Sequence, residues 1–206
     1  MIGDARQARV TLVVKRLMDL ALALPACIVL APVFLGIALA IRLDSPGPAL
    51  FRQPRRGRGM RPFTFVKFRS LRHGAPDPHA RYEMVEADPR ITRVGAFLRR
   101  TSLDELPQLF NVLAGSMSLV GPRPLVEWES QAAFTTHPER FRVKPGLTGL
   151  SQVVVRNSVD FASRLDKDVE YVRDFGLGLD LWILARTPRV ILRGDMVYPQ
   201  RGEEAD

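Results

Sequence analysis

The sequence predicts an α+β fold that is mainly helical and has a kinked membrane helix at its N-terminus. Three observations predict this class: a long uncharged segment near the start, a basic stretch with the alternation of a small β element, and later segments with apolar residues at helical spacing. With 206 residues, of which 46% are apolar, the chain is long enough for one folded domain and an anchor. We expect the anchor in residues 1–44 and the folded domain in residues 45–206.

The cysteine and histidine content restricts the chemistry. Cys27 is the only cysteine, which excludes a disulfide framework and any cysteine-cluster zinc or iron–sulfur site. The three histidines lack the spacing of metal ligands. The formal net charge of +8 predicts a polyanionic partner, which is nucleic acid, an anionic lipid surface or a phosphorylated substrate.

The uncharged segment covers the 22 residues 20–41 and is long enough to span a bilayer as a helix. Pro25 and Pro32 interrupt it and predict a kink, for which the central Pro32 is the favoured position. Basic residues on both sides favour a cytoplasmic location for both ends. The segment is therefore predicted to be re-entrant: it enters the membrane, bends near Pro32 and leaves by the same face.

Three other interpretations of this segment compete with a re-entrant helix. A cleavable signal peptide fits the small-x-small site at 38–40, but its apolar stretch is shorter than this one. An ordinary single span would place the basic remainder of the chain outside the cell, against the distribution of positive charge. A buried core helix of this length does not suit so small a domain.

The stretch 45–76 holds eight Arg or Lys residues and no acid. After a Ser-Pro-Gly-Pro turn it alternates through 49–53 and 61–69, which predicts a basic hairpin. Most of its arginines are expected on a solvated surface or one that faces lipid headgroups. Lys67 and Arg69 alternate with apolar residues of the second strand, so we expect both to be held firmly and directed at a phosphate.

Asp104 and Glu105 are adjacent carboxylates in the part of the sequence richest in motifs. They follow a helix predicted over 94–100 and open a second helix predicted from Ser102. Ser102 and Glu105 also match a capping box, which would make the acids structural. Nearby arginines favour the other interpretation, a magnesium-bound diphosphate attacked by one carboxylate. The apolar side of the second helix is expected to carry Leu103, Leu106, Phe110 and Leu113.

Six motifs follow one another from about Lys15 to Thr187. They are Lys15-Arg16 with Asp19, Ser45 to Pro48, Lys67 to Ser70, Thr101 to Leu113, Met117 to Pro124 and Lys144 to Leu150. Together they resemble the bacterial sugar transferase family, and in particular its small monotopic members, the polyprenyl-phosphate phosphoglycosyl transferases. Several long motifs in the same order are far more specific than any one of them.

The resemblance implies an activity and a location. A phosphosugar would move from a UDP-sugar to undecaprenyl phosphate with release of UMP, in the first membrane step of bacterial glycoconjugate or polysaccharide synthesis. The enzyme would reside at the bacterial inner (cytoplasmic) membrane, in contact with membrane lipid, with its active site on the cytoplasmic face. No nucleic acid partner is expected, and a homo-oligomer is compatible with the sequence.

The resemblance also implies roles for single residues. Asp104 would attack the β-phosphorus and form a covalent Asp–phosphosugar, Glu105 would assist by positioning or proton transfer, and Mg²⁺ would bind against Asp104. In an alternative one-step transfer, the carboxylates bind only the metal. Val155 departs from a family glycine, and Ala31 departs from a serine at the helix break. The side chains expected to clamp phosphate oxygens are Lys67, Arg69, Arg99, Arg123 and Arg156.

Other segments are predicted in outline. Residues 124–140 and 177–192, each with one tryptophan, are expected to be helices that either lie at the membrane interface or pack on the core. Residues 166–171 are expected to form a solvated helix face. Residues 144–150 are expected to form a turn with glycines at positive φ, or a loop whose N–H groups approach the nucleotide. Residues 74–90 are expected to be a surface connection.

A function from another class stays open at this point. A non-catalytic, membrane-anchored basic module would bind anionic lipid or nucleic acid through residues 52–72. Such a module would be indifferent to Asp104 and would depend steeply on salt. The enzyme, in contrast, would require both Asp104 and magnesium.

Overall fold

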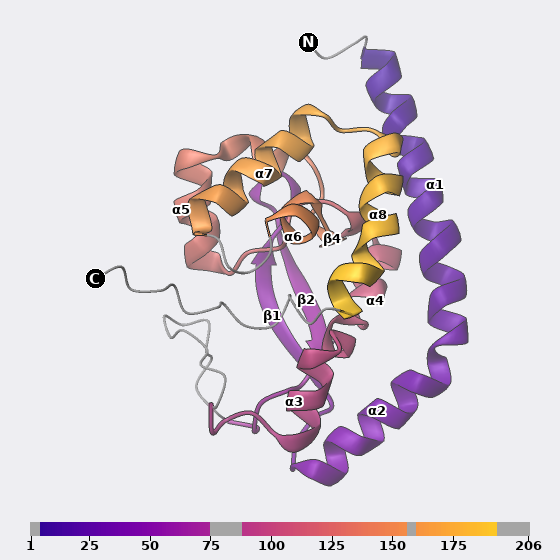
Figure 1. The fold of residues 1–206 in the computed structure, drawn as a ribbon, viewed down its shortest axis with the longest axis vertical. Coiled ribbons are helices and arrows are strands. Elements are labelled where there is room, and N and C mark those ends of the chain that lie inside the picture. The colour runs from indigo at the N-terminus through magenta and orange to yellow at the C-terminus, as the bar shows by residue number, and fades with distance from the viewer. Residues whose placement is uncertain (1–4, 75–87, 156–159, 193–206) are drawn as a thin grey trace.

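The computed structural model describes residues 5–74, 88–155 and 160–192, and within them the fold is mainly helical with two small sheets, as predicted. A bent helix pair runs along one side of the molecule (Figure 1). Single 3-10 turns connect several elements. The helices and strands are α1 Ala5–Val29, α2 Ala31–Asp44, β1 Leu50–Arg56, β2 Pro62–Phe68, α3 Arg93–Arg100, α4 Gln108–Ala114, β3 Ser118–Val120, α5 Glu127–Thr136, β4 Gly146–Thr148, α6 Leu150–Val154, α7 Phe161–Arg173 and α8 Leu177–Leu192.

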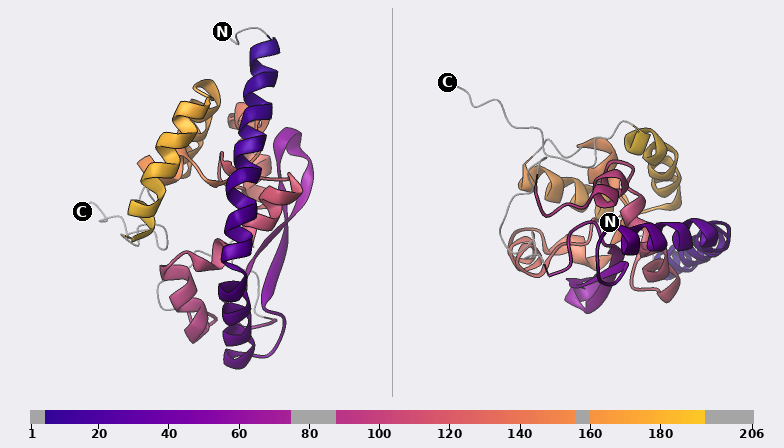
Figure 2. Two further views of the ribbon diagram at one scale, coloured as in Figure 1. Left: turned by 90° about the vertical axis from the view of Figure 1, so that its right-hand side faces the viewer. Right: turned by 90° about the horizontal axis from the view of Figure 1, so that it is seen from below.

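The N-terminal segment bends where the central proline predicted. Helices α1 and α2 meet at Leu30 with a bend of 59°, and Pro32 lies in the first turn of α2, whereas Pro25 lies within α1. Among the described residues no single helix has both the length and the hydropathy of a membrane span, but these two helices have them together. Figure 2 shows the helix pair from two further directions. The pair therefore has the form of a broken span or a re-entrant loop.

Most of the large apolar side chains exposed in the described part of the chain belong to this helix pair. An exposed apolar surface of this extent is typical of contact with a membrane or another protein. The exposed residues of the pair are Val10, Leu12, Val13, Val14, Leu17, Leu22, Leu24, Ile28, Val29, Val33, Leu35, Leu39 and Leu43.

Polar side chains of α1 fasten this helix to the rest of the fold. Lys15 forms a buried ion pair with Asp180 of α8. Asp19 accepts hydrogen bonds from a backbone amide and a hydroxyl group of β3, at 2.9 and 3.0 Å. Arg16 donates to two carbonyl groups of the last turn of α4, at 2.6 and 2.8 Å. Lys15 and Arg16, two basic residues that precede the uncharged segment, therefore contact the folded domain.

The predicted β element is confirmed as an antiparallel hairpin. Strands β1 and β2 pair with Leu50 opposite Phe68 and with Arg56 opposite Pro62. A second sheet pairs β3 and β4 in parallel. One apolar cluster joins the two sheets to the anchor, because Ala23 of α1 and Phe65 of β2 pack in it with residues of α4, β3 and α8.

Three glycines pack backbone against backbone where β3 and β4 meet. A Cβ atom on Gly146 would lie 2.1 Å from the nitrogen of Gly121, and one on Gly149 would lie 2.2 Å from the oxygen of Gly121. Neither Gly146 nor Gly149 is among the residues with positive φ, so the prediction of a positive-φ turn over 144–150 is wrong. These glycines are required by close approach rather than by an unusual backbone angle.

The carboxylate pair does not open a continuous helix, because it lies in a single 3-10 turn and α4 begins only after Pro107, which lacks an amide hydrogen. Ser102 makes no capping hydrogen bond and has left-handed backbone angles with φ 54°, so the predicted capping box is wrong. The predicted apolar side is wrong in part, because Leu103 and Leu113 pack against apolar clusters but Phe110 does not face the core. Leu109 and Val112 are buried in α4, whereas Phe110 is 45% exposed.

The prediction of a solvated face over 166–171 is wrong as well, because Asp168 and Tyr171 of α7 are buried. The hydroxyl of Tyr171 donates to Asp180 at 2.8 Å, and Asp168 pairs with Arg140 at 2.8 Å. Segments such as this one alternate exposed and buried polar residues, and their polarity alone does not show which are buried.

The two tryptophan segments form helices where they were expected, as α5 and α8. Trp128 is 51% exposed and Trp182 is 39% exposed, while Ile183 is buried in the core. Helix α8 thus packs one side on the core and leaves apolar residues on the other, and its location at a membrane interface stays a prediction. Of the expected surface connection over 74–90, residues 75–87 lie outside the described residues.

Candidate active site

Asp104 is a carboxylate held almost entirely away from water, since only 7% of it is exposed. It lies in the 3-10 turn Leu103–Glu105 between α3 and α4, two residues after Ser102. The positive φ of Ser102 is unfavourable for a residue with a side chain, and strain of this kind concentrates at functional sites. The strained turn places Asp104 in the interior.

Three basic side chains from three elements act on Asp104: Lys67 of β2, Arg99 of α3 and Arg123 from the turn after β3. Arg99 donates from Nε to a serine hydroxyl just after β2, at 3.0 Å. Arg123 donates from Nη2 to Oε1 of Glu105 at 2.9 Å. The two carboxylates and the three cations therefore form one cluster, although 56 positions separate Lys67 from Arg123 in the sequence.

The cluster perturbs the acidity of its members. Burial and the charge of Glu105 together raise the pKa of Asp104 to about 6, although the three cations oppose the rise. Burial lowers the pKa of Lys67 to about 8, while Asp104 opposes that fall. At neutral pH the carboxylate is therefore ionised and the ammonium group protonated. Perturbed groups of this kind are concentrated at catalytic sites.

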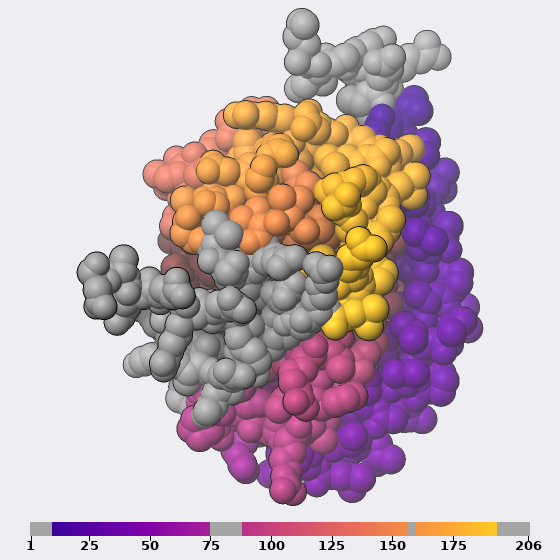
Figure 3. Space-filling view, in the orientation of Figure 1, coloured from indigo at the N-terminus to yellow at the C-terminus, as the bar shows by residue number. Residues whose placement is uncertain are grey.

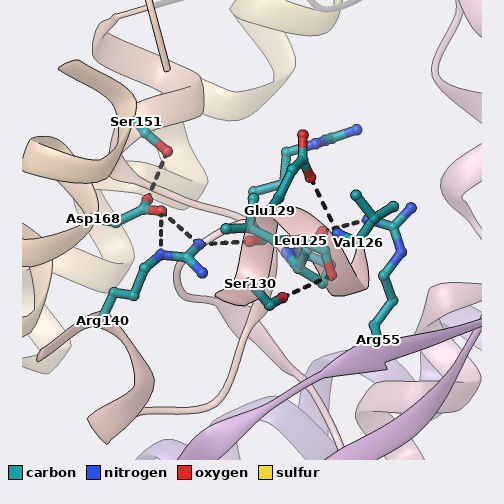
Figure 4. A network of polar contacts seen from close by, with 10 residues as sticks. Arg55, Leu125, Val126, Glu129, Ser130, Arg140, Ser151 and Asp168 are labelled. Atoms are coloured by element: carbon teal, nitrogen blue, oxygen red, sulfur yellow. Dashed lines mark hydrogen bonds and ion pairs between the residues drawn. The ribbon is translucent and has the colours of Figure 1, made fainter. Parts of the chain in front are cut away.

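The turn that carries Arg123 is held by two buried guanidinium groups. Arg140 donates to the Arg123 carbonyl at 2.8 Å, and Arg55 donates to the next carbonyl at 2.9 Å. Asp168 pairs with Arg140 and also accepts a hydrogen bond from Ser151, as Figure 4 shows. Moving such paired buried charges is costly, so the network fixes the position from which Arg123 reaches the carboxylates.

Two residues predicted to bind phosphate, Arg69 and Arg156, are not shown in the cluster around Asp104. Arg69 donates to the carbonyl groups of Pro46 and Ser45, at 2.5 and 2.8 Å, and so holds the turn between α2 and β1. Its Nε alone has no hydrogen-bond partner. Arg156 lies outside the described residues. The structure thus brings together the other residues predicted for the site, which are Asp104, Glu105, Lys67, Arg99 and Arg123.

Comparison with known proteins identifies the family of the chain. A family model described as Bacterial sugar transferase matches residues 10–194. The chain belongs to the bacterial sugar transferase family. The resemblance drawn from the six motifs is confirmed, and with it the expectation that the chain is an enzyme of this family.

Relatives of this sugar transferase carry related names. A Caulobacter vibrioides protein named UDP-glucose:undecaprenyl-phosphate glucose-1-phosphate transferase is 42% identical over 89% of this chain and 72% of its own length. The exopolysaccharide production protein PSS of Rhizobium leguminosarum is 42% identical over 85% of this chain and 94% of its own length. An uncharacterized sugar transferase of Haemophilus influenzae is 41% identical over 90% of this chain and 42% of its own length. The chain thus spans less than half of some relatives and nearly all of another.

A cavity of about 860 Å³ lies between α2 and the hairpin of this sugar transferase. Lys67 lines it, so the cavity reaches the cluster around Asp104. Leu50 and Phe51 contribute apolar wall, while Arg42 adds positive charge. The volume is that of a ligand pocket. Sequence reasoning missed this cavity, because its walls come from segments that meet only in the folded chain.

The carboxylate pair of this sugar transferase suits a magnesium ion. Mg²⁺ at phosphoryl-transfer sites is bound by one or two carboxylates, and substrate phosphates and water fill its other positions. Asp104 and Glu105 supply that number. Within residues 5–74, 88–155 and 160–192, no group of three or more His, Cys, Asp or Glu side chains forms a metal site by itself. Because Glu105 is paired with Arg123, Asp104 is the better placed ligand.

Proposed function

We propose that this chain is a phosphoglycosyl transferase that moves a sugar phosphate from a UDP-sugar to undecaprenyl phosphate and releases UMP. The observation that carries the proposal is the buried Asp104 carboxylate with Lys67, Arg99 and Arg123 acting on it. Family membership and the name of the Caulobacter vibrioides relative support both substrates. One anionic nucleophile among three cations is the arrangement needed to bring a carboxylate to a charged diphosphate.

In the first step an ionised oxygen of Asp104 attacks the β-phosphorus of the donor. A bond forms between that oxygen and phosphorus, the bond from phosphorus to the bridging oxygen breaks, and UMP leaves with the bridging oxygen. Lys67, Arg99 and Arg123 offset the charge that develops on the phosphate oxygens. The product on the enzyme is an acyl phosphate that joins Asp104 to the sugar phosphate.

In the second step an oxygen of the lipid phosphate attacks the phosphorus of this adduct. The new bond forms the lipid diphosphate sugar, and the bond to Asp104 breaks and restores the carboxylate. Glu105, held by Arg123, positions the reacting groups or moves a proton. A covalent enzyme intermediate divides one transfer into two steps and requires ping-pong kinetics.

Magnesium belongs to the proposal as a resident ion. Asp104, with Glu105 beside it, would hold the ion against the diphosphate, and the ion would supply charge neutralisation at the phosphate oxygens. Asp104 then has a double task, because the carboxylate that binds the metal is also the nucleophile. The cationic side chains stay responsible for orienting the donor.

The acceptor lipid belongs in the cavity between α2 and the hairpin. The cavity has apolar walls for a polyprenyl chain, and Lys67 in its lining offers a cation to the lipid phosphate. It adjoins the helix pair whose apolar surface is exposed, which supports residence at a membrane with the site at headgroup level. A re-entrant helix pair leaves both of its ends on the same face of the membrane. The site and the soluble donor would then lie on the cytoplasmic side.

The test is UMP release from a panel of UDP-sugars by detergent-purified protein with Mg²⁺ and undecaprenyl phosphate. We expect release with at least one sugar, loss of release with Asp104→Asn or with EDTA, and normal release with the control Asp174→Asn, an exposed aspartate of the same fold. A labelled sugar phosphate that stays on wild-type protein in the absence of lipid supports the two-step scheme. Folded protein that releases no UMP with any donor would contradict the proposal and favour the non-catalytic anchored module.

A further inference from the structure

The function proposed above assigns no role to the hydroxyl group of Ser70, although this residue closes the motif that begins at Lys67. Ser70 lies just after the end of β2, and only 3% of it is exposed. Its Oγ accepts a hydrogen bond from Nε of Arg99 at 3.0 Å. A buried hydroxyl group thus contacts one of the three cations that act on Asp104.

The backbone of Ser70 packs directly on helix α3, which carries Arg99. The Ser70 carbonyl accepts a hydrogen bond from the Thr92 amide at 3.1 Å. Gly95, in the first turn of α3, lies so close to the same carbonyl that a Cβ atom there would overlap its oxygen. Only glycine permits this approach of two backbones. The hydroxyl group of Ser70 is therefore fixed relative to α3.

Helix α3 itself is fastened near both of its ends. The Val94 amide in its first turn donates to the carboxylate of Asp44, the last residue of α2, at 3.0 Å. Leu98 in its last turn is buried in an apolar cluster with one residue of α2 and one of β2. The backbone that carries Arg99 is therefore fixed, and what remains to be fixed is the long side chain of Arg99.

The charges around Arg99 do not by themselves hold its guanidinium group at Asp104. Arg99 interacts electrostatically with Asp104 and Lys67 in the cluster, and also with Asp88, which lies before α3. Lys67 repels the guanidinium group, while Asp88 attracts it as Asp104 does. A flexible arginine between two acids and a like charge requires a further contact to keep one position. The hydrogen bond from Nε to Ser70 supplies that contact.

We propose that Ser70 is a positioning residue of the active site, whose hydroxyl group holds the guanidinium group of Arg99 at the cluster around Asp104. The inference rests on the proposed function, because Arg99 offsets the charge of the donor phosphates there. The end of β2 then places two cations. It carries Lys67 directly, and three residues later it holds Arg99 through a hydrogen bond that the positive charge of the donor strengthens.

The kinetic test compares UMP release by wild-type protein with release by Ser70→Ala, which removes only the hydroxyl group. We expect kcat to fall about tenfold, because a hydrogen bond to a charged group is lost. KM for the UDP-sugar is expected to change less than about twofold, since the charge that Arg99 offsets develops in the transition state. Ser70→Thr keeps a hydroxyl group and is expected to restore most of kcat. The control is Thr187→Val, which removes a half-buried hydroxyl group that contacts Thr148.

A double-mutant cycle separates positioning from a contribution to the fold. In the Arg99→Met background, Ser70→Ala is expected to lower kcat no further, because the group that Ser70 positions is already absent. A hydroxyl group that served only the fold would lower kcat by the same factor in both backgrounds. Additive effects in the cycle would therefore overturn the inference.

A measurement without turnover tests the contact itself. The Nε–H signal of Arg99 in an NMR spectrum of ¹⁵N-labelled protein is identified by its absence in Arg99→Met. Its exchange with water is expected to be at least about tenfold faster in Ser70→Ala than in wild type. Equal exchange rates would overturn the inference even where the enzyme turns over. Wild-type protein that shows the protected signal but releases no UMP would contradict the proposed function and leave the contact between Ser70 and Arg99 established.

Discussion

The ammonium group of Lys15 and the carboxylate of Asp180 form an ion pair in the interior, although 165 positions separate them along the chain. The side chains are 8% and 0% exposed. The Tyr171 hydroxyl donates to the second oxygen of the same carboxylate. The pair ties the anchor helix α1 to α8, and both helices contribute to one apolar cluster although they lie near opposite ends of the described chain. Figure 3 shows α8 against α1 on the molecular surface.

Lys15→Met is expected to destabilise the fold by about 3–5 kcal/mol, because it leaves the buried Asp180 carboxylate without its cation. Thermal unfolding in detergent measures this. The control is Lys167→Met, which removes one partner of a partly exposed pair with Glu170 and is expected to cost less than about 1 kcal/mol. Equal losses in the two variants would show that the buried pair contributes nothing beyond a surface pair.

Turnover is expected to fall as the pH drops through about 6, because the proposed nucleophile Asp104 must be ionised to attack, and burial together with Glu105 raises its pKa to about 6. The pH profile of kcat/KM measures the group in the free enzyme. An unperturbed aspartate would keep full activity to about pH 4. An acid limb near pH 4 would therefore contradict the burial of this carboxylate.

Glu105→Gln is expected to move that acid limb to lower pH. The negative charge of Glu105 raises the pKa of Asp104, and the neutral amide removes this effect. The maximal rate is expected to fall at the same time, because the ion pair with Arg123 is lost. Glu139→Gln, away from the cluster, serves as the control for a lost carboxylate. An acid limb that stays in place would show that the two carboxylates do not interact.

Asp104→Asn is expected to stabilise the protein above pH 6. The raised pKa means that the folded state prefers the protonated acid, so this stability is present below about pH 4 and is lost as the pH rises through about 6. Roughly two pKa units correspond to about 3 kcal/mol. Melting temperatures at pH 5 and pH 8 measure the effect, with the largest gain at pH 8. A variant less stable than wild type at pH 8 would contradict it.

Gly121→Ala is expected to destabilise the fold by about 3 kcal/mol or more, because its Cβ atom would lie 2.4 Å from the Lys144 carbonyl oxygen. Gly178→Ala is the matched control, since no atom lies within 4 Å of a Cβ there and alanine favours a helix such as α8 by up to about 1 kcal/mol. Denaturant unfolding of both variants measures the difference. Similar stabilities would exclude a steric role for the contact between β3 and β4.

Local patterns in the sequence predicted the elements that depend on local physics. A proline in an uncharged helix predicted the bend near Pro32, and alternation predicted the hairpin. The juxtaposed acids and arginines predicted a cluster at Asp104, and the structure groups these residues. For the bend and the hairpin the cause lies within a few residues of the effect, whereas the cluster joins Lys67 and Arg123 across 56 positions of the sequence.

Predictions that depended on distant contacts were wrong or absent. The capping box at Ser102 is wrong because this residue has left-handed backbone angles and its side chain accepts no capping hydrogen bond. Asp168 was expected on a solvated face, but it is buried with Arg140, which lies 28 positions away. The cavity beside Lys67 comes from segments that meet only after folding.

The hydrogen bonds from β3 to Asp19 fix how helix α1 is rotated about its axis relative to the turn that carries Arg123. Strand β3 begins at the groups that bind Asp19 and ends just before the turn of Arg123. Inserting one residue between Asp19 and the bend would rotate everything beyond it by about 100° around the helix axis. The apolar surface of the end of α1 and of α2 would then face another direction, while Arg123 stayed in place. An unrelated anchor grafted onto this domain would have to reproduce that angular register as well as the hydrophobicity.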